Sequence, residues 1–377
     1  MLVDGRLWPA TPVATSVTRL IVPLAVVTRT AADDDDAFLQ QVLDVLARHP
    51  TVPVVALGGG SILDVARLAA LAVVDPAFRA LLNAAAGAVL APAAAPAPLR
   101  MWPAARNAAN PVVGIPTTLG TAAEVSPIAI LRRGGSTQMF ASPALRARAA
   151  ILDPAATAGH DRAAVVTGLV EPLSRALVPA VTGARLPLQD GLARALVEVL
   201  FDLGDSAGQA PDDDWRLSAA LASSQTHTAF LGLGRSPFGH ALWPFATEMM
   251  VALGLTKAEA LARLLPAWLR GLAGGNLGAA FGSEARARAI LGQPPAEAAA
   301  RMAGWLTGLG PPLARPDRLG AQPGGLLPGG RVPGGAGPDR AAVVASRVRT
   351  VWQATGFFLP GATPAEVDWL SEAAVAP

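Results

Sequence analysis

Two short segments of the sequence carry residues that are suited to binding phosphate. The first, Gly58-Gly59-Gly60-Ser61, lies between an apolar run at 52–57 and a segment with helical periodicity at 61–74. Three glycines let backbone N–H groups approach a pyrophosphate closely, and a helix N-terminus adds a positive partial charge. Ser61 can cap the helix or donate to a phosphate oxygen. The same residues can also form a plain tight turn, because their spacing is not the G-x-G-x-x-G of an ordinary Rossmann domain.

The second segment is the loop at 116–126, PTTLGTAAEVS, which follows another apolar run at 112–115. It supplies the hydroxyl groups of Thr117, Thr118 and Thr121 together with a glycine. Ligands of open α/β sheets bind at the carboxyl ends of strands. The sequence therefore predicts that two strand-end loops form one phosphate-binding cradle.

These motifs resemble those of a known enzyme family. GGGSILDVAR is similar to the GGGSxxDxAK motif of iron-containing (group III) alcohol dehydrogenases, and PTTLGTAAEVS is similar to their PTTxGTGSExT loop, with Ala122 and Ala123 as departures. ILDP at 151–154 and TPAEVDWLSEAA near the C-terminus also resemble segments of that family. The resemblance covers nearly the whole chain and implies the dehydroquinate synthase-like fold, an α/β N-terminal dinucleotide-binding domain followed by an all-α C-terminal domain.

The resemblance also implies an NAD(P) cofactor. Gly58, Gly59, Gly60 and Ser61 would hold the pyrophosphate, and Asp64 would orient the turn or the nicotinamide side. Thr117, Thr118 and Thr121 would contact the adenosine and phosphate portions.

Arg29 follows the first predicted strand, where the family often has an acidic residue on the ribose hydroxyls. An arginine there can pair with a 2′-phosphate, so we expect a preference for NADP(H). The alternative is a solvated loop residue.

The metal ligands of the family are largely replaced. Family members bind iron or zinc through one Asp and three His. By the resemblance, the Asp position holds Val170 and the His positions hold Ser174, His240 and Lys257, so His240 alone matches. A second family His, four residues after His240, is replaced by Pro244. Dehydroquinate synthases use a G-x-x-E pattern, which makes Glu171 the one candidate carboxylate. Two ligands are too few for a catalytic site, which needs three protein groups. We therefore expect that no divalent iron or zinc is bound.

The alternative chemistry is charge substitution. Lys257, the sole lysine of the chain, would place a fixed positive charge where the metal was and stabilise a developing alkoxide. His240 would relay protons, and Glu171 would hold one of the two. The competing interpretations are a surface lysine and a structurally satisfied histidine, and His160 is expected to be solvated.

The change in sequence pattern along the chain predicts where the domains divide. A strand at 19–28, a helix after Asp33–Asp36 and the elements around the two loops give an α/β domain over 1–156, with an irregular insertion at 75–110. From 157 to 377 long Ala/Leu patterns predict helices, interrupted by a Gly/Pro-rich loop at 309–338.

Composition limits the function classes. The chain has 377 residues, no cysteine and a net charge of +2 without a basic block, so disulfides, thiolate sites and a nucleic-acid partner are not expected. Neither a membrane span nor a signal peptide is expected, and the predicted location is the cytoplasm.

The sequence favours an NAD(P)-dependent oxidoreductase for an alcohol or carbonyl group. Such an enzyme could tailor secondary metabolites, acting as a homodimer on a small molecule or on a peptide of the daptide type. Two alternatives stay open: a dehydroquinate synthase-like lyase or cyclase, and a nucleotide-binding pseudoenzyme that acts as a scaffold.

Overall fold

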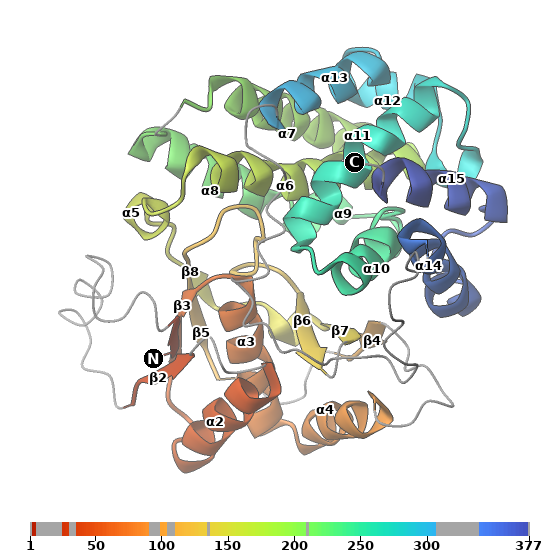
Figure 1. The fold of residues 1–377 in the computed structure, drawn as a ribbon. Coiled ribbons are helices and arrows are strands. Elements are labelled where there is room, and N and C mark those ends of the chain that lie inside the picture. Colours follow the sequence, from red (N-terminus) through yellow and green to blue (C-terminus); the bar gives the residue numbers. More distant parts are fainter. Residues whose placement is uncertain are drawn as a thin grey trace, which may run out of the picture. The chain divides into compact units, whose positions relative to one another are not determined.

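The structure is a computed structural model that describes residues 2–4, 25–29, 35–89, 99–103, 110–133, 136–208, 211–306 and 339–375. The chain divides into two compact units (Figure 1). The first contains the chain up to His160 together with Asp212–Ser224, and the second contains Asp161–Pro211 and most of the chain from Gln225 onward. The sequence predicted that all residues from 157 onward lie in the second domain. Asp212–Ser224 differs from this prediction, because it lies in the first unit.

A parallel sheet forms the centre of the first unit. Its five strands lie in the order β2-β1-β3-β5-β8, and each neighbouring pair is parallel. The strands are β1 (Leu2–Asp4), β2 (Val27–Arg29), β3 (Val54–Gly58), β5 (Val112–Pro116) and β8 (Ala149–Ala150). Apolar runs of this kind are typical of parallel strands, which helices cover. The runs predicted at 52–57 and 112–115 are therefore confirmed as β3 and β5.

Helices α2 (Asp35–Arg48) and α3 (Gly60–Val74) pack against one another in the same unit. Every residue of α3 from Ile62 to Ala72 is buried, because its alanines and leucines let it lie between the sheet and its neighbours. The α3 helix is thus a rigid support for the glycine turn that precedes it.

A smaller sheet of order β4-β7-β6 completes the unit. It consists of β4 (Leu99–Met101), β6 (Ile128–Arg133) and β7 (Ser136–Ala141), and β6 pairs antiparallel with β7. Two short helices, η1 (Pro143–Leu145) and α5 (Pro154–Thr157), follow. The α8 helix (Asp213–Gln225) belongs almost entirely to this unit although it comes later in the sequence.

One expectation for the first unit needs correction. The insertion at 75–110 was expected to be irregular, but Pro76–Val89 forms helix α4. The Asp75 carboxylate accepts from the N–H groups of Ala77 and Phe78, which starts this helix, and Phe78 and Leu82 bury one face of it. The strand predicted at 19–28 lies mostly outside the described residues; within them, Val27–Arg29 is strand β2.

The second unit is built from helices. They are α6 (Arg162–Thr182), α7 (Pro187–Ser206), α9 (Ala229–Gly232), α10 (Trp243–Leu253), α11 (Lys257–Ala273), α12 (Glu284–Leu291), α13 (Pro295–Leu306), α14 (Arg340–Arg347) and α15 (Pro364–Val375), with the shorter η2 (Ala279–Phe281), η3 (Val348–Trp352) and η4 (Gln353–Thr355). In Figure 1, α11 runs beside α6, and the two pack against each other. This all-helical unit confirms the predicted fold class, an α/β part followed by a helical part.

Helix α6 is the central helix of this unit. By length and composition it is the one described helix that could cross a membrane, but 83% of its apolar window is buried inside the fold. Its apolar character is therefore explained by its packing against α7, α11, α12 and α13. The Gly/Pro-rich loop predicted at 309–338 lies outside the described residues.

Candidate functional site

The glycine turn connects β3 to α3 in the first unit. Gly59 is the N-cap of α3 in an extended conformation, and no side chain caps the helix. Ser61 therefore does not act as the cap, and its hydroxyl instead accepts a hydrogen bond from the Arg29 guanidinium at 2.8 Å. A helix start without a side-chain cap leaves its backbone N–H end suited to an anion.

The threonine loop lies directly against this turn. Gly58 pairs with Pro116 across β3 and β5, and the N–H of Thr117 donates to the carbonyl of Gly58 at 3.0 Å. A Cβ atom added at Gly59 would lie 3.2 Å from Thr118 Cγ2, and one added at Gly60 would lie 3.2 Å from Thr121 Cγ2. The two predicted loops thus meet so closely that a side chain would fill the space between them.

Arg29 lies next to the turn as well. Its guanidinium is 2.7 Å from the buried Asp35 carboxylate and lies over the Phe38 ring at 5.8 Å. Arg29 is therefore not the solvated loop residue of the alternative interpretation. One carboxylate already pairs with it, so its positive charge is partly compensated before any ligand arrives.

Asp64 has a different environment from the glycines. Its carboxylate accepts from the Arg67 guanidinium and from the N–H of Ile130 at 2.9 Å. Arg67 also donates to the carbonyls of Ser126 and Ile128. These contacts connect α3 to the segment after the threonine loop, so Asp64 positions the two loops relative to each other.

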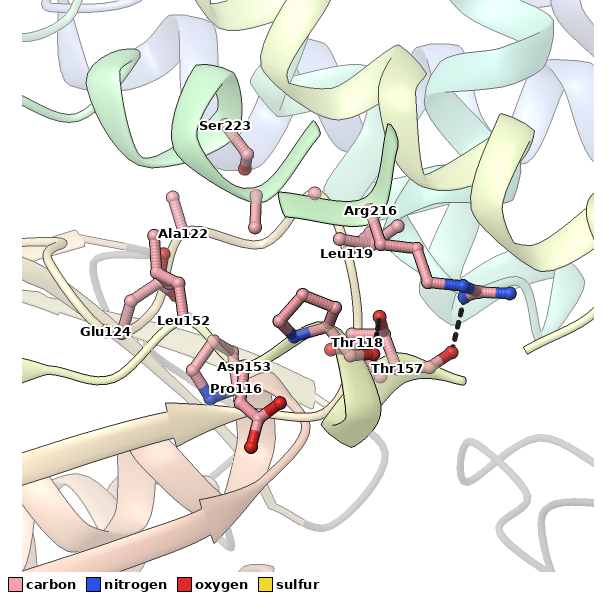
Figure 2. A pocket seen from close by; sticks show the side chains of 13 residues that line it. Pro116, Thr118, Leu119, Ala122, Glu124, Leu152, Asp153, Thr157, Arg216 and Ser223 are labelled. Atoms are coloured by element: carbon pink, nitrogen blue, oxygen red, sulfur yellow. Dashed lines mark hydrogen bonds between the residues drawn. The ribbon is translucent and has the colours of Figure 1, made fainter. Parts of the chain in front are cut away.

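A hollow of about 340 Å³ lies beside the threonine loop (Figure 2). Its wall includes Thr118, Gly120 and Glu124 from the loop, Asp153 and Thr157 from the α5 region, and Ser223 and Arg216 from α8. This volume includes space that is open to solvent, so the hollow is a shallow depression beside the threonine loop and not an enclosed ligand pocket.

The α8 helix is anchored over this hollow by hydrogen bonds that the sequence did not reveal. Ser224 donates to the buried Glu124 carboxylate at 2.6 Å, and Arg216 donates to the carbonyls of Thr157 at 2.5 Å and His160 at 3.1 Å. The His160 ring lies 2.6 Å from the carbonyl of Thr117. The expectation that His160 is solvated is therefore wrong, because this ring supports the threonine loop.

The second unit brings Lys257 and Glu171 together. The Lys257 ammonium lies 2.9 Å from Glu171 Oε1, and the Arg175 guanidinium lies 2.8 Å from the same oxygen. Arg175 also donates to the Thr226 hydroxyl at 2.8 Å. Lys257 is the first residue of α11, where the helix dipole opposes a positive charge, so the Glu171 carboxylate has to compensate it.

His240 lies in the same unit just before α10. Its Nε2 atom is 3.3 Å from the Ser174 hydroxyl, and its ring stacks on Trp243 with centroids 5.1 Å apart. Burial lowers the pKa of His240 well below its ordinary value, and the nearby charges of Lys257 and Arg175 lower it further. The imidazole is therefore neutral at physiological pH.

These residues do not fit a divalent metal. Among the described residues no group of three or more His, Cys, Asp and Glu side chains is close enough to hold an ion. The Glu171 carboxylate already carries two cations, and the Ser174 hydroxyl donates to the carbonyl of Glu171 at 2.8 Å. A metal cation at this position would be repelled by the positive charges of Lys257 and Arg175, which lie where further ligands would be needed.

Arg175 and Trp243 were not selected from the sequence. Arg175 follows Glu171 by four residues on one helix, a spacing at which opposite charges pair, so this signal was present. Trp243 belongs to the quoted GHALWPF segment, but only the fold shows that Lys257 lies 5.2 Å above its ring.

Comparison with known proteins identifies a family and individual enzymes to which this chain is similar. Residues 1–154 match the family described as iron-containing alcohol dehydrogenase. A long-chain-alcohol dehydrogenase of Geobacillus thermodenitrificans is 30% identical over 211 residues, which cover 55% of this chain and 49% of that protein. A phosphonoacetaldehyde reductase of Streptomyces viridochromogenes is 33% identical over 221 residues, covering 56% and 52%. The matches thus span about half the length of these relatives.

Solved structures match over the whole chain. An NADH-dependent butanol dehydrogenase of Thermotoga maritima has a TM-score of 0.72 at 15% identity, covering 99% of this chain and 90% of that one. A sulfoacetaldehyde reductase of Bifidobacterium kashiwanohense, solved with NAD⁺, has a TM-score of 0.67 at 18% identity, covering 100% and 91%. Residues 1–154 are therefore similar to the iron-containing alcohol dehydrogenase family, and the chain as a whole has the fold of these solved structures.

Proposed function

We propose that the protein is an NAD(P)-dependent oxidoreductase that acts on an alcohol or carbonyl group. The observation that carries this proposal is the close approach of Gly59 and Gly60 to Thr118 and Thr121, which places the uncapped N-terminus of α3 beside the hydroxyl groups of the threonine loop. Relatives named as alcohol dehydrogenases and aldehyde reductases support the same chemistry.

The residues of the cradle fit the dinucleotide. Gly58, Gly59, Gly60 and Ser61 would hold the pyrophosphate, and Thr117, Thr118 and Thr121 would contact the adenosine and phosphate portions. The nicotinamide, when bound, supplies the chemistry of hydride acceptance or donation. We propose NADP(H) as the preferred form, because Arg29 lies at the turn and hydrogen-bonds Ser61.

The second unit would act on the substrate oxygen without a metal ion. The Lys257 ammonium is held by Glu171 and would stabilise the negative charge that develops on this oxygen. Oxidation of an alcohol also releases a proton, for which His240 would be the acceptor. The neutral imidazole has a lone pair for this proton, and because its pKa is lowered, it would pass the proton on and not keep it.

Steady-state kinetics test this proposal. The purified protein is assayed with NADPH and NADH against straight-chain aldehydes, and with NADP⁺ and NAD⁺ against the matching alcohols. We expect cofactor-dependent turnover that chelation of metal ions leaves unchanged. Absence of turnover on the whole panel, with the cofactors still bound, would instead support a nucleotide-binding pseudoenzyme.

The pseudoenzyme is the second candidate function. It is favoured by the two cations on Glu171, which replace the family's metal chemistry. The same contacts remove the feature that favoured a dehydroquinate synthase-like lyase, because Glu171 is engaged by Lys257 and Arg175 instead of being available to an ion.

Finer aspects of the function rest on the sequence resemblance. We propose a role in tailoring secondary metabolites in the cytoplasm, with a small molecule or the C-terminus of a daptide-type peptide as substrate, and a homodimer as the working form. The genes beside this one would name the pathway, and light scattering would give the oligomeric state. A gene neighbourhood of primary alcohol metabolism would contradict the tailoring role.

A further inference from the structure

Besides Arg286 Nε, two buried polar atoms in the second unit have no hydrogen-bond partner among the described residues. They are Nδ1 of His240 and Nε1 of Trp243, and the two residues are 3% and 8% exposed. An unsatisfied buried polar group destabilises a fold, so such atoms call for an explanation. Both belong to one stacked pair of rings, whose planes differ by only 15°. One ligand that satisfies both atoms would explain them together.

The hydrogen-bond network assigns the role of each atom. The Ser174 hydroxyl uses its proton on the carbonyl of Glu171, so it can only accept from His240 Nε2. When the neutral imidazole carries its proton on Nε2, Nδ1 has a lone pair; the ring also interacts with the backbone of His240 and Ser174. The indole Nε1 of Trp243 is a donor only. A hydroxyl group, which donates one hydrogen bond and accepts others, is complementary to this pair.

The surrounding charge favours an oxygen that becomes negative. Lys257 lies 5.2 Å above the Trp243 ring, and Arg175 and Lys257 together outnumber the single carboxylate of Glu171 by one charge. An alcohol oxygen that is neutral in the bound substrate and partly negative in the transition state is stabilised by this excess positive charge.

We propose that Trp243 is a further substrate-binding residue, whose indole N–H donates to the oxygen of a primary or secondary alcohol, or of its carbonyl product. The same oxygen gives its proton to His240 Nδ1 and accepts from Lys257. This inference rests on the proposed oxidoreductase function and adds to it a second donor at the reacting oxygen.

The substitution Trp243→Phe tests the inference, because it removes the N–H and keeps most of the ring. We expect kcat and kcat/KM to fall together by about tenfold to a hundredfold, since the donor acts mainly in the transition state. The melting temperature is expected to stay or to rise, because an unsatisfied buried donor is lost.

Trp305→Phe is the matched control within the same unit. Trp305 Nε1 donates to Asp205 at 2.6 Å, so its loss should lower the melting temperature and leave turnover unchanged. If both variants behave alike, with lower stability and unchanged turnover, Trp243 is structural and the inference is wrong.

Proton NMR gives a readout that is independent of turnover. The chain has 8 tryptophans, and the Trp243→Phe spectrum identifies the Trp243 indole N–H signal. Addition of a straight-chain alcohol from the kinetic panel should move this signal downfield, whereas the Trp305 signal should stay in place. A wild-type protein that converts no alcohol or aldehyde refutes the proposed function; an active wild type with an unmoved Trp243 signal refutes only this inference.

Discussion

Replacement of Lys257 by methionine should lower kcat strongly but change the free energy of unfolding only a little. A unit charge about 4 Å from a full negative charge contributes about 4 kcal/mol at an effective dielectric constant of 20. The Lys257 side chain is 20% exposed, so solvent screens part of this energy. Loss of one preorganised donor costs about 3 kcal/mol in comparable sites. We therefore expect kcat to fall by about a hundredfold.

The effect on stability should be small. The Glu171 carboxylate keeps its bond to Arg175 at 2.8 Å, so no buried charge is left without a partner. Removal of a cation from the first position of α11 also relieves an unfavourable interaction with the helix dipole, worth about 0.3–1 kcal/mol. The free energy of unfolding of Lys257→Met should thus differ from the wild type by about 1 kcal/mol or less.

The assay compares kcat and chemical denaturation for Lys257→Met and for Arg270→Met. Arg270 is exposed and lies thirteen residues further along the same helix, about 20 Å away, so its loss removes the same charge from a distant position. Methionine at 257 should also raise the pKa of His240, because Lys257 lowers it, and the acid limb of alcohol oxidation should move to higher pH. Turnover within twofold of the wild type would refute a role for this charge.

Three further predictions concern other parts of the molecule. Arg29→Gln should reduce kcat/KM for NADPH about tenfold and leave that for NADH nearly unchanged, as a charged hydrogen bond to a 2′-phosphate requires; equal losses would contradict this role. Metal analysis of the purified protein should find less than one iron or zinc per chain, and added zinc should not increase turnover; a stoichiometric, activating metal would refute charge substitution. Burial raises the pKa of Asp190, but hydrogen bonds from Arg286 and Arg235 outweigh it and lower the pKa overall. Asp190 therefore stabilises the fold above its unfolded pKa of about 3.9, and this stability is lost as the pH falls through the lower folded value. The destabilisation in Asp190→Asn should be about 1–3 kcal/mol at neutral pH and should shrink below about pH 4 in thermal melts; a difference that grows in acid would contradict this.

Much of the first unit could be predicted because its signals are local. Three glycines between an apolar run and a helical pattern define a turn wherever they occur, and β3, α3 and β5 follow the predicted segments closely. Helix α4 was missed because the prolines that follow it in the same stretch are typical of loops, while the cap at Asp75 and the burial of Phe78 depend on the fold.

The candidate site was less predictable because it depends on distant contacts. Glu171 and Lys257 are 86 positions apart, and only the packing of α6 against α11 brings their charges together. The α8 helix joins the first unit through Arg216 and Ser224, whose partners precede them in sequence by many residues. No sequence periodicity encodes such pairs.

Calorimetric titration of the wild type with NADPH and NADH tests the dinucleotide cradle most directly, with Gly60→Ala as the disruptive variant. A Cβ at Gly60 would press against Thr121 at 3.2 Å, whereas one at Gly304, in helix α13, would meet nothing within 4 Å. We predict one binding event per chain in the wild type and in Gly304→Ala, and an affinity at least about tenfold weaker in Gly60→Ala. No binding to the wild type, or equal affinity in Gly60→Ala, would contradict the account.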